Sequence, residues 1–190
     1  MANGMYHYLT QAWKKPTPAF LREKLIAWRA GESVVKLEKP IRLDRARAVG
    51  YKAKKGIVVV RVRVLRGGRK RPRHEHGRKS RKQHIRKILK MNYRWVAELR
   101  AAKKFKNLEV LNSYHLAKDG KYYFYEVILV DPTKPEVLND KNYSWLGKAT
   151  NRNRVFRGLT GAGKKSRGLV RKGINNKNGP SQRSHDRQGK

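Results

Sequence analysis

The chain has 190 residues and a formal net charge of +36, with 49 lysines and arginines against 13 aspartates and glutamates. This length predicts a single domain, with or without long extensions. Repulsion among so many like charges opposes compaction, so a polyanionic partner, foremost a nucleic acid, is expected. Cysteine is absent, which excludes disulfides and thiolate metal sites.

The sequence contains no apolar run of about eighteen residues, so it predicts no membrane-spanning helix and no membrane partner. The N-terminus lacks the basic start and apolar stretch of a signal peptide. A cytoplasmic location is therefore expected.

The positive charge is unevenly distributed along the chain. Residues 98–140 are neutral, with seven basic and seven acidic side chains, whereas residues 1–97 carry +23 and residues 141–190 carry +13. Only the neutral stretch has the composition of an ordinary globular protein. The sequence therefore predicts a basic N-terminal helical or extended region (1–56), an α+β core with a basic loop at 66–82 (57–132), and a basic extended C-terminal tail (133–190).

The first predicted element is a helix near the N-terminus. Thr17 followed by Pro18 is typical of a helix start, and Gly31 is typical of a helix end. The apolar side of this helix is formed by Leu21, Leu25 and Trp28.

Three strands are predicted further along the chain. Residues 57–65 begin uniformly apolar and then alternate, with valines on one face and Arg61 and Arg63 on the other. One end of this strand is therefore expected to be buried, and the other to carry its arginines outward into the basic loop. Residues 110–116 and 122–130 flank an Asp-Gly pair, a strong hairpin signal. The second of these strands is apolar on both faces, which predicts a central, covered strand.

A helix is predicted over residues 80–105, where apolar residues recur at spacings of three and four. Together these elements predict the α+β class. From Thr150 onward the chain is poor in bulky apolar residues and rich in Arg, Lys, Asn and Gly. We therefore expect that segment to be disordered on its own in water.

The densest positive charge lies in residues 61–90, where fourteen basic residues face a single acidic one, Glu75. Residues 66–73 (RGGRKRPR) combine arginine forks, which bind phosphate oxygens in pairs, with glycines that allow close backbone approach. Residues 78–82 (RKSRK) place positive charge at the start of the predicted helix, which the helix dipole disfavours unless a phosphate docks there. A solvated loop is the alternative, but this density of charge favours nucleic acid.

Residues 158–166 (GLTGAGKKS) resemble a nucleotide-binding P-loop imperfectly. That motif places Ser or Thr directly after the first lysine, whereas Lys165 stands there and the hydroxyl comes one residue late. The preceding residues are polar and basic, not a buried strand. We therefore interpret Thr160 as the N-cap of a short helix that presents Lys164, Lys165 and Arg167 to a phosphate backbone.

No catalytic or metal site is predicted. His74 and His76 have no second cluster to complete a coordination shell, and no serine, histidine and carboxylate form a catalytic pattern. No cofactor and no small-molecule substrate are therefore expected. Six aromatic residues stand among the charges and could stack on unpaired bases, although packing is the commoner fate of an aromatic side chain. They are Tyr6, Trp13, Tyr51, Tyr143, Trp145 and Phe156, of which Tyr51 and Trp145 are the main candidates.

Several runs, taken in order, resemble protein fifteen of the large ribosomal subunit, the kind found in archaea and eukaryotes, and favour an archaeal-type member. The runs are 43–54 (LDRARAVGYKAK), 61–64 (RVRV), 66–72 (RGGRKRP), 110–114 (VLNSY), 126–132 (EVILVDP) and 157–169 (RGLTGAGKKSRGL). The resemblance implies a small mixed β-sheet packed on helices, with long basic N- and C-terminal extensions threaded between ribosomal RNA helices. It also implies no catalytic activity.

The resemblance further implies that the basic loop and the Gly-rich segment lie in RNA. This points to Arg66, Arg69, Lys70, Arg71, Arg73, Lys164, Lys165 and Arg167. The other RNA-binding candidates are Arg45, Arg47, Lys52, Lys54, Lys55, Arg63, Arg78, Lys79, Arg81, Lys82, Arg154, Arg157 and Arg171. The predicted partners are large-subunit ribosomal RNA and neighbouring large-subunit ribosomal proteins, and no homo-oligomer is expected.

Two other functions stay open on the residues alone. A chromatin-type protein that binds duplex DNA shares the positive charge, and competition between duplex DNA and structured RNA separates the two. A nucleotide-hydrolysing assembly factor would rest on the imperfect P-loop, and binding of a labelled nucleotide with magnesium tests it. Only the resemblance points to the ribosome.

Overall fold

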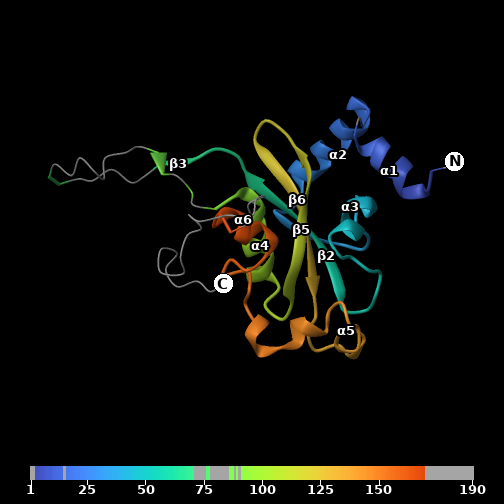
Figure 1. The fold of residues 1–190 in the computed structure, drawn as a ribbon. Helices are drawn as coiled ribbons and strands as arrows, with labels where there is room; N and C mark the ends of the chain where they lie inside the picture. Colours follow the sequence, from blue (N-terminus) through green and yellow to red (C-terminus); the bar gives the residue numbers. More distant parts are fainter. Residues whose placement is uncertain are drawn as a thin grey trace.

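The computed structural model of the chain describes residues 3–14, 16–70, 76–77, 86–87, 89 and 91–169. Its centre is a four-stranded sheet in the order β1–β2–β6–β5 (Figure 1). The strands are β1 (Val34–Leu37), β2 (Ile57–Leu65), β6 (Tyr122–Val130) and β5 (Glu109–Lys118). The predicted α+β class is confirmed, but the implied mixed sheet is antiparallel in all three of its pairings.

The β5–β6 hairpin forms at the predicted Asp-Gly turn. The Asp119 side chain accepts hydrogen bonds from the backbone N–H groups of Lys121 (2.7 Å) and Tyr122 (2.5 Å), which fixes the start of β6. Every residue of β6 from Phe124 onward is buried. The prediction of a central, covered strand is therefore confirmed.

The sequence predicts the full length of β2, the other central strand, but not the helix that covers its arginine face. Its valines at even positions are buried against α4 (Tyr93–Lys104). On the opposite face, Arg61 and Arg63 are half-buried, and the Arg61 guanidinium lies 5.2 Å from the ring centre of Trp28 in α2 (Pro18–Ala30). The arginines thus pack beneath a helix instead of leading outward, because an aromatic face is available to cover them.

Helix α4 is shorter than the helix predicted over residues 80–105. It begins after Asn92, whose Oδ1 accepts a hydrogen bond from the backbone N–H of Trp95 at 2.7 Å. Upstream, the short strand β4 (Arg86–Lys87) pairs with β3 (Arg69–Lys70). The prediction is wrong at residues 86–87, which form a strand, and α4 starts only after Asn92, a capping residue in an extended conformation. Residues 80–85, 88 and 90 lie outside the described residues.

Three helices lie on the face of the sheet opposite α4 (Figure 1). Helix α2 starts at Pro18 and has Gly31 as its C-cap, as predicted, although the Thr17 side chain makes no capping hydrogen bond. Its Trp28 is buried, which confirms the predicted apolar side. Helices α1 (Met5–Lys14) and α3 (Leu43–Ala48), like strand β1, were not predicted, since each is short and buries one residue or none.

The C-terminal part packs in two places: residues 137–146 lie against Ile57 and Val130 at one end of the sheet, and residues 155–162 join the core on the α4 face. It contains α5 (Pro135–Leu138), two 3₁₀ helices, η2 (Ser144–Gly147) and η3 (Ala149–Asn151), and α6 (Gly161–Ser166). Val155 and Ala162 are buried in the same core as Val34 and Val127, so all three predicted regions contribute to it. The prediction of disorder from residue 150 onward is wrong for residues 150–169, because a few small apolar side chains and many polar contacts hold that segment. Residues 170–190 lie outside the described residues.

Candidate nucleic-acid interface

The structure sorts the predicted RNA-binding side chains by their exposure. The exposed ones are Arg45, Arg47, Lys52, Lys54, Lys55, Arg66, Lys164 and Lys165. Three are half-buried, namely Arg63, Arg154 and Arg157, and Arg167 is only 5% exposed. Arg69 and Lys70 are described by their backbone in β3. Outside the described residues lie Arg71, Arg73, Arg78, Lys79, Arg81, Lys82 and Arg171.

Helix α3 presents two of the exposed arginines. Its buried residue is Ala46, which packs against the sheet and turns Arg45 and Arg47 outward. The Arg47 guanidinium lies 5.2 Å from the ring centre of Tyr6 in α1 and donates a hydrogen bond to its hydroxyl. Within the described part of the chain, neither arginine has a carboxylate partner, so both keep their charge available to an anion.

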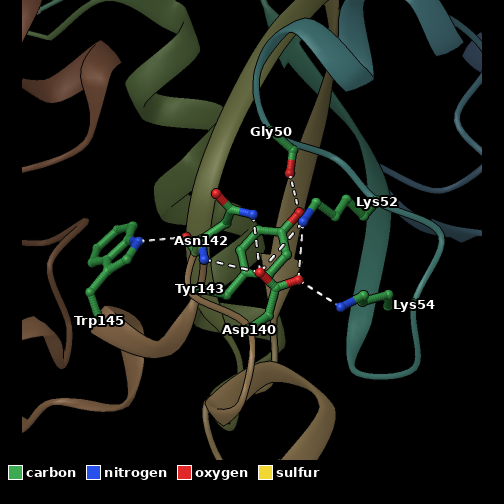
Figure 2. Close-up of polar contacts among 7 residues, drawn as sticks. All are labelled: Gly50, Lys52, Lys54, Asp140, Asn142, Tyr143 and Trp145. Atoms are coloured by element: carbon green, nitrogen blue, oxygen red, sulfur yellow. Dashed lines mark hydrogen bonds and ion pairs between the residues drawn. The ribbon is translucent and has the colours of Figure 1, made fainter.

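The loop between α3 and β2 is fastened by Asp140 (Figure 2). An Asp140 carboxylate oxygen lies 2.6 Å from the Lys54 Nζ and 3.1 Å from the Lys52 Nζ. The Tyr143 hydroxyl donates a hydrogen bond to the carbonyl of Gly50 at 2.6 Å, so two contacts join the same pair of loops. The hydrogen bond from Lys54 is the main reason that the pKa of Asp140 lies well below its usual value.

These ion pairs make the lysines of the loop differ in how much charge they offer to an external anion. Lys52 and Lys54 share one carboxylate, so their two charges count as about one toward an external anion. Lys55 is exposed, and no described acidic side chain forms an ion pair with it. We therefore expect Lys55 to be the freest cation of this loop.

The C-terminal arginines are bound to backbone carbonyls of their own chain. Arg154 donates to the carbonyl oxygens of Val110 (2.9 Å) and Leu159 (3.2 Å), across the gap between β5 and the segment before α6. Arg167 donates to the carbonyl of Gly158 at 3.3 Å from within the fold. The guanidinium groups of these two residues therefore hold the segment together, a use that their sequence context does not reveal.

Helix α6 is capped as predicted. The Thr160 Oγ1 accepts a hydrogen bond from the Gly163 backbone N–H at 3.2 Å. Lys164 and Lys165 lie exposed on this helix, with no described acidic side chain in an ion pair with either. Of the basic residues expected on this helix, the two lysines reach the surface and Arg167 does not.

The glycines of this segment serve close packing of the chain. A Cβ atom on Gly163 would lie 2.7 Å from the Gly158 backbone, and Gly158 itself has a φ of +67°. The two glycines therefore allow one stretch of backbone to lie directly on another. The Gly pattern that resembles a P-loop is explained by this contact.

The root of the basic loop is held by aromatic residues. The Tyr93 hydroxyl makes hydrogen bonds of 3.0 Å with both the N–H and the carbonyl of Gly67. The Arg66 guanidinium lies 5.0 Å from the ring centre of Tyr123 and also donates to the carbonyl of Asp119. The loop thus leaves the sheet from a fixed point.

The two main candidates for base stacking, Tyr51 and Trp145, have protein partners. Tyr51 is half-buried beside Ala46. The Trp145 indole N–H donates to the Asn142 carbonyl at 2.8 Å, and the Arg154 guanidinium lies 4.7 Å from its ring centre (Figure 2 shows the indole contact). Their packing is sufficient to explain why aromatic residues stand at these positions.

Sequence reasoning missed two buried carboxylates. Glu98 and Glu126 are each 0% exposed, one on each face of the sheet. Burial raises the pKa of both carboxyl groups, and hydrogen bonds from hydroxyl and backbone donors oppose the rise. The available signal is spacing: Glu98 stands three residues after Trp95 on the apolar face of α4, where a glutamate is unusual.

Two negative observations apply to the described part of the chain only. No described helix is long and apolar enough to cross a membrane. No group of three or more described His, Asp or Glu residues could hold a metal ion. Of the two histidines weighed as metal ligands, His76 is exposed and His74 lies outside the described residues.

The fold and its exposed cations define a basic α+β protein whose surface suits an anionic partner. Residues 4–185 match the family model described as Ribosomal L15. The chain is also similar to the large ribosomal subunit protein eL15 of Methanocella arvoryzae, 50% identical over 196 residues that cover all of both chains.

The chain belongs to the Ribosomal L15 family, which confirms the resemblance to an archaeal-type member. Proteins of this family are structural, non-enzymatic components of the large ribosomal subunit, in the cytoplasm. The predicted class, location and lack of enzymatic activity are therefore confirmed by family membership.

Proposed function

We propose that this chain binds and braces large-subunit ribosomal RNA through contacts with backbone phosphates, beside neighbouring large-subunit proteins. The observation that supports this most directly is that α6 exposes two lysines while the two carboxylates of the core are hidden. Lys164 and Lys165 are exposed, whereas Glu98 and Glu126 are 0% exposed. A polyanion approaching this surface therefore meets cations and is not repelled by the hidden carboxylates.

The chemistry of the exposed groups favours phosphate over base recognition. Lysine is a point charge on a flexible stem, which suits a phosphate but does not read a base edge. Most sequence-specific RNA recognition uses unstacked bases on open aromatic faces, and Tyr51 and Trp145 are packed in the protein. We therefore propose that the RNA is recognised mainly by its shape and backbone. The same net charge opposes self-association, so we propose that one copy binds alone.

Salt dependence tests this proposal. If about ten phosphates are neutralised, the affinity of the full chain for deproteinised large-subunit ribosomal RNA should fall with a log–log slope of about −7 to −9. Filter binding across a series of potassium chloride concentrations measures the slope. A slope near zero would show that phosphate contacts do not drive binding.

A further inference from the structure

A buried carboxylate connects α4 to the segment that carries the exposed lysines. Glu98 lies on α4 with no exposed surface, and its Oε2 accepts a hydrogen bond from the Thr160 hydroxyl at 2.5 Å. Its Oε1 accepts one from the Ser113 hydroxyl on β5. The carboxylate therefore bridges the sheet and the start of α6.

Thr160 links the Glu98 carboxylate to α6. Its hydroxyl donates to Glu98 and accepts from the Gly163 N–H, so one buried side chain both caps the helix and fixes it to α4. Helix α6 has six residues, far fewer than an isolated helix needs for stability in water. Its orientation must therefore come from these tertiary contacts.

Both ends of α6 are also fixed to Asn92, the N-cap residue of α4. The Asn92 backbone N–H donates to the Ser166 hydroxyl at 2.8 Å, and the Asn92 side chain donates to the Ala162 carbonyl at 3.0 Å. All of these contacts lie on the inner side of the helix. Lys164 and Lys165 lie exposed on the same helix.

We propose that Glu98, acting through Thr160, is a positioning residue that sets the direction of Lys164 and Lys165 toward RNA. This inference rests on the proposed function. A carboxylate is a poor choice for stability alone, because apolar residues of similar volume often serve a core equally well or better. What the carboxylate offers is direction: each of its two oxygens accepts from one fixed hydroxyl. Burial also keeps its negative charge away from the bound polyanion.

A pair of matched substitutions at Thr160 tests the connection. Thr160→Val keeps the shape of the side chain and removes both hydrogen bonds, whereas Thr160→Ser keeps both. We expect Thr160→Val to weaken binding of the full chain to deproteinised large-subunit ribosomal RNA about tenfold. Thr160→Ser should bind within about twofold of the wild type.

The decisive measurement combines Thr160→Val with Lys164→Ala and Lys165→Ala. If Thr160 acts through the lysines, it should have no further effect on affinity once they are gone. An undiminished loss in that background, or no loss from Thr160→Val alone, overturns the inference. If the lysine substitutions by themselves leave affinity unchanged, the proposed use of α6 fails and the inference fails with it.

A second substitution covers the case in which Thr160→Val does not fold. Glu98→Gln preserves the size of the side chain but replaces one acceptor oxygen by a donor. It should show the same dependence on Lys164 and Lys165 in the combined variants. A loss of affinity that is independent of the lysines overturns the inference here as well. Denaturant unfolding of each variant identifies those that are folded.

Discussion

Replacing Glu126 by alanine is expected to lower the free energy of unfolding of the full chain by about 3 kcal/mol. The Glu126 carboxylate accepts hydrogen bonds from the Tyr114 hydroxyl and from the Ile41 backbone N–H, the latter at 3.0 Å. Arg61, directly opposite on β2, supplies a nearby positive charge. Alanine would leave these buried groups without an acceptor, and the approach to α3 would lose its attachment.

Urea unfolding followed by tryptophan fluorescence measures this loss, at a salt concentration high enough to screen the net charge. Tyr114→Phe is the matched control, since it removes one donor and leaves the carboxylate in place; its cost should be smaller. A free energy of unfolding for Glu126→Ala within about 0.5 kcal/mol of the wild type would show that the carboxylate does not hold this face together.

Glu126→Gln gives the same site a pH signature. Because burial raises the pKa of Glu126 above its ordinary 4.5, the folded state holds the proton more tightly than the unfolded state. The stability contributed by this carboxyl is therefore full below pH 4.5 and is lost as the pH rises through the folded-state pKa. As the pH rises above 4.5, the free energy of unfolding of the wild-type chain should fall relative to that of Glu126→Gln.

Removal of the two α6 lysines should produce the largest effect on RNA binding among the described exposed residues. Each phosphate contact adds about 0.7 to 0.9 to the salt slope, so Lys164→Ala with Lys165→Ala should reduce the slope by about 1.5. At 0.1 M salt this corresponds to about a thirtyfold loss of affinity. Filter binding at several salt concentrations gives both quantities in one experiment.

The control removes the same charge from another place. Lys103 in the last turn of α4 and Lys106 just after the helix are both exposed, at the end of α4 away from Asn92, and belong to the stretch with no net charge. Lys103→Ala with Lys106→Ala should change the affinity by less than about threefold, because only the long-range field is altered. Equal losses in the two double variants would mean that net charge alone governs binding and that α6 is not a contact.

The sequence predicts elements with a strong hydrophobic period and misses those without one. The hairpin strands and β2 combine apolar patterns with a clear turn, so their positions are predictable, as is the central place of β6, which is apolar on both faces. Helix α3 buries only Ala46 and leaves little pattern. The predicted helix is wrong at residues 86–87, which form a strand, and a capping asparagine, Asn92, sets the start of α4; periodicity does not show such a residue.

The candidate site shows the same limit. Positive charge predicts that Lys164, Arg154 and Arg167 belong to a basic segment, but composition does not tell which of them reach the surface. Only the fold shows that Arg154 and Arg167 donate to backbone carbonyls while Lys164 faces outward. A guanidinium carries several donors in a rigid fork, so arginine serves a buried backbone as readily as a phosphate. Exposure has to come from the structure.

Sedimentation of a tagged copy of the full chain through a sucrose gradient, with and without RNase, tests the central claim most directly. We expect the protein to travel with the large subunit, to resist a moderate-salt wash, and to move to the light fractions after RNase treatment. A protein that stays in the light fractions without RNase, or that follows DNA, would contradict binding to ribosomal RNA in the large subunit.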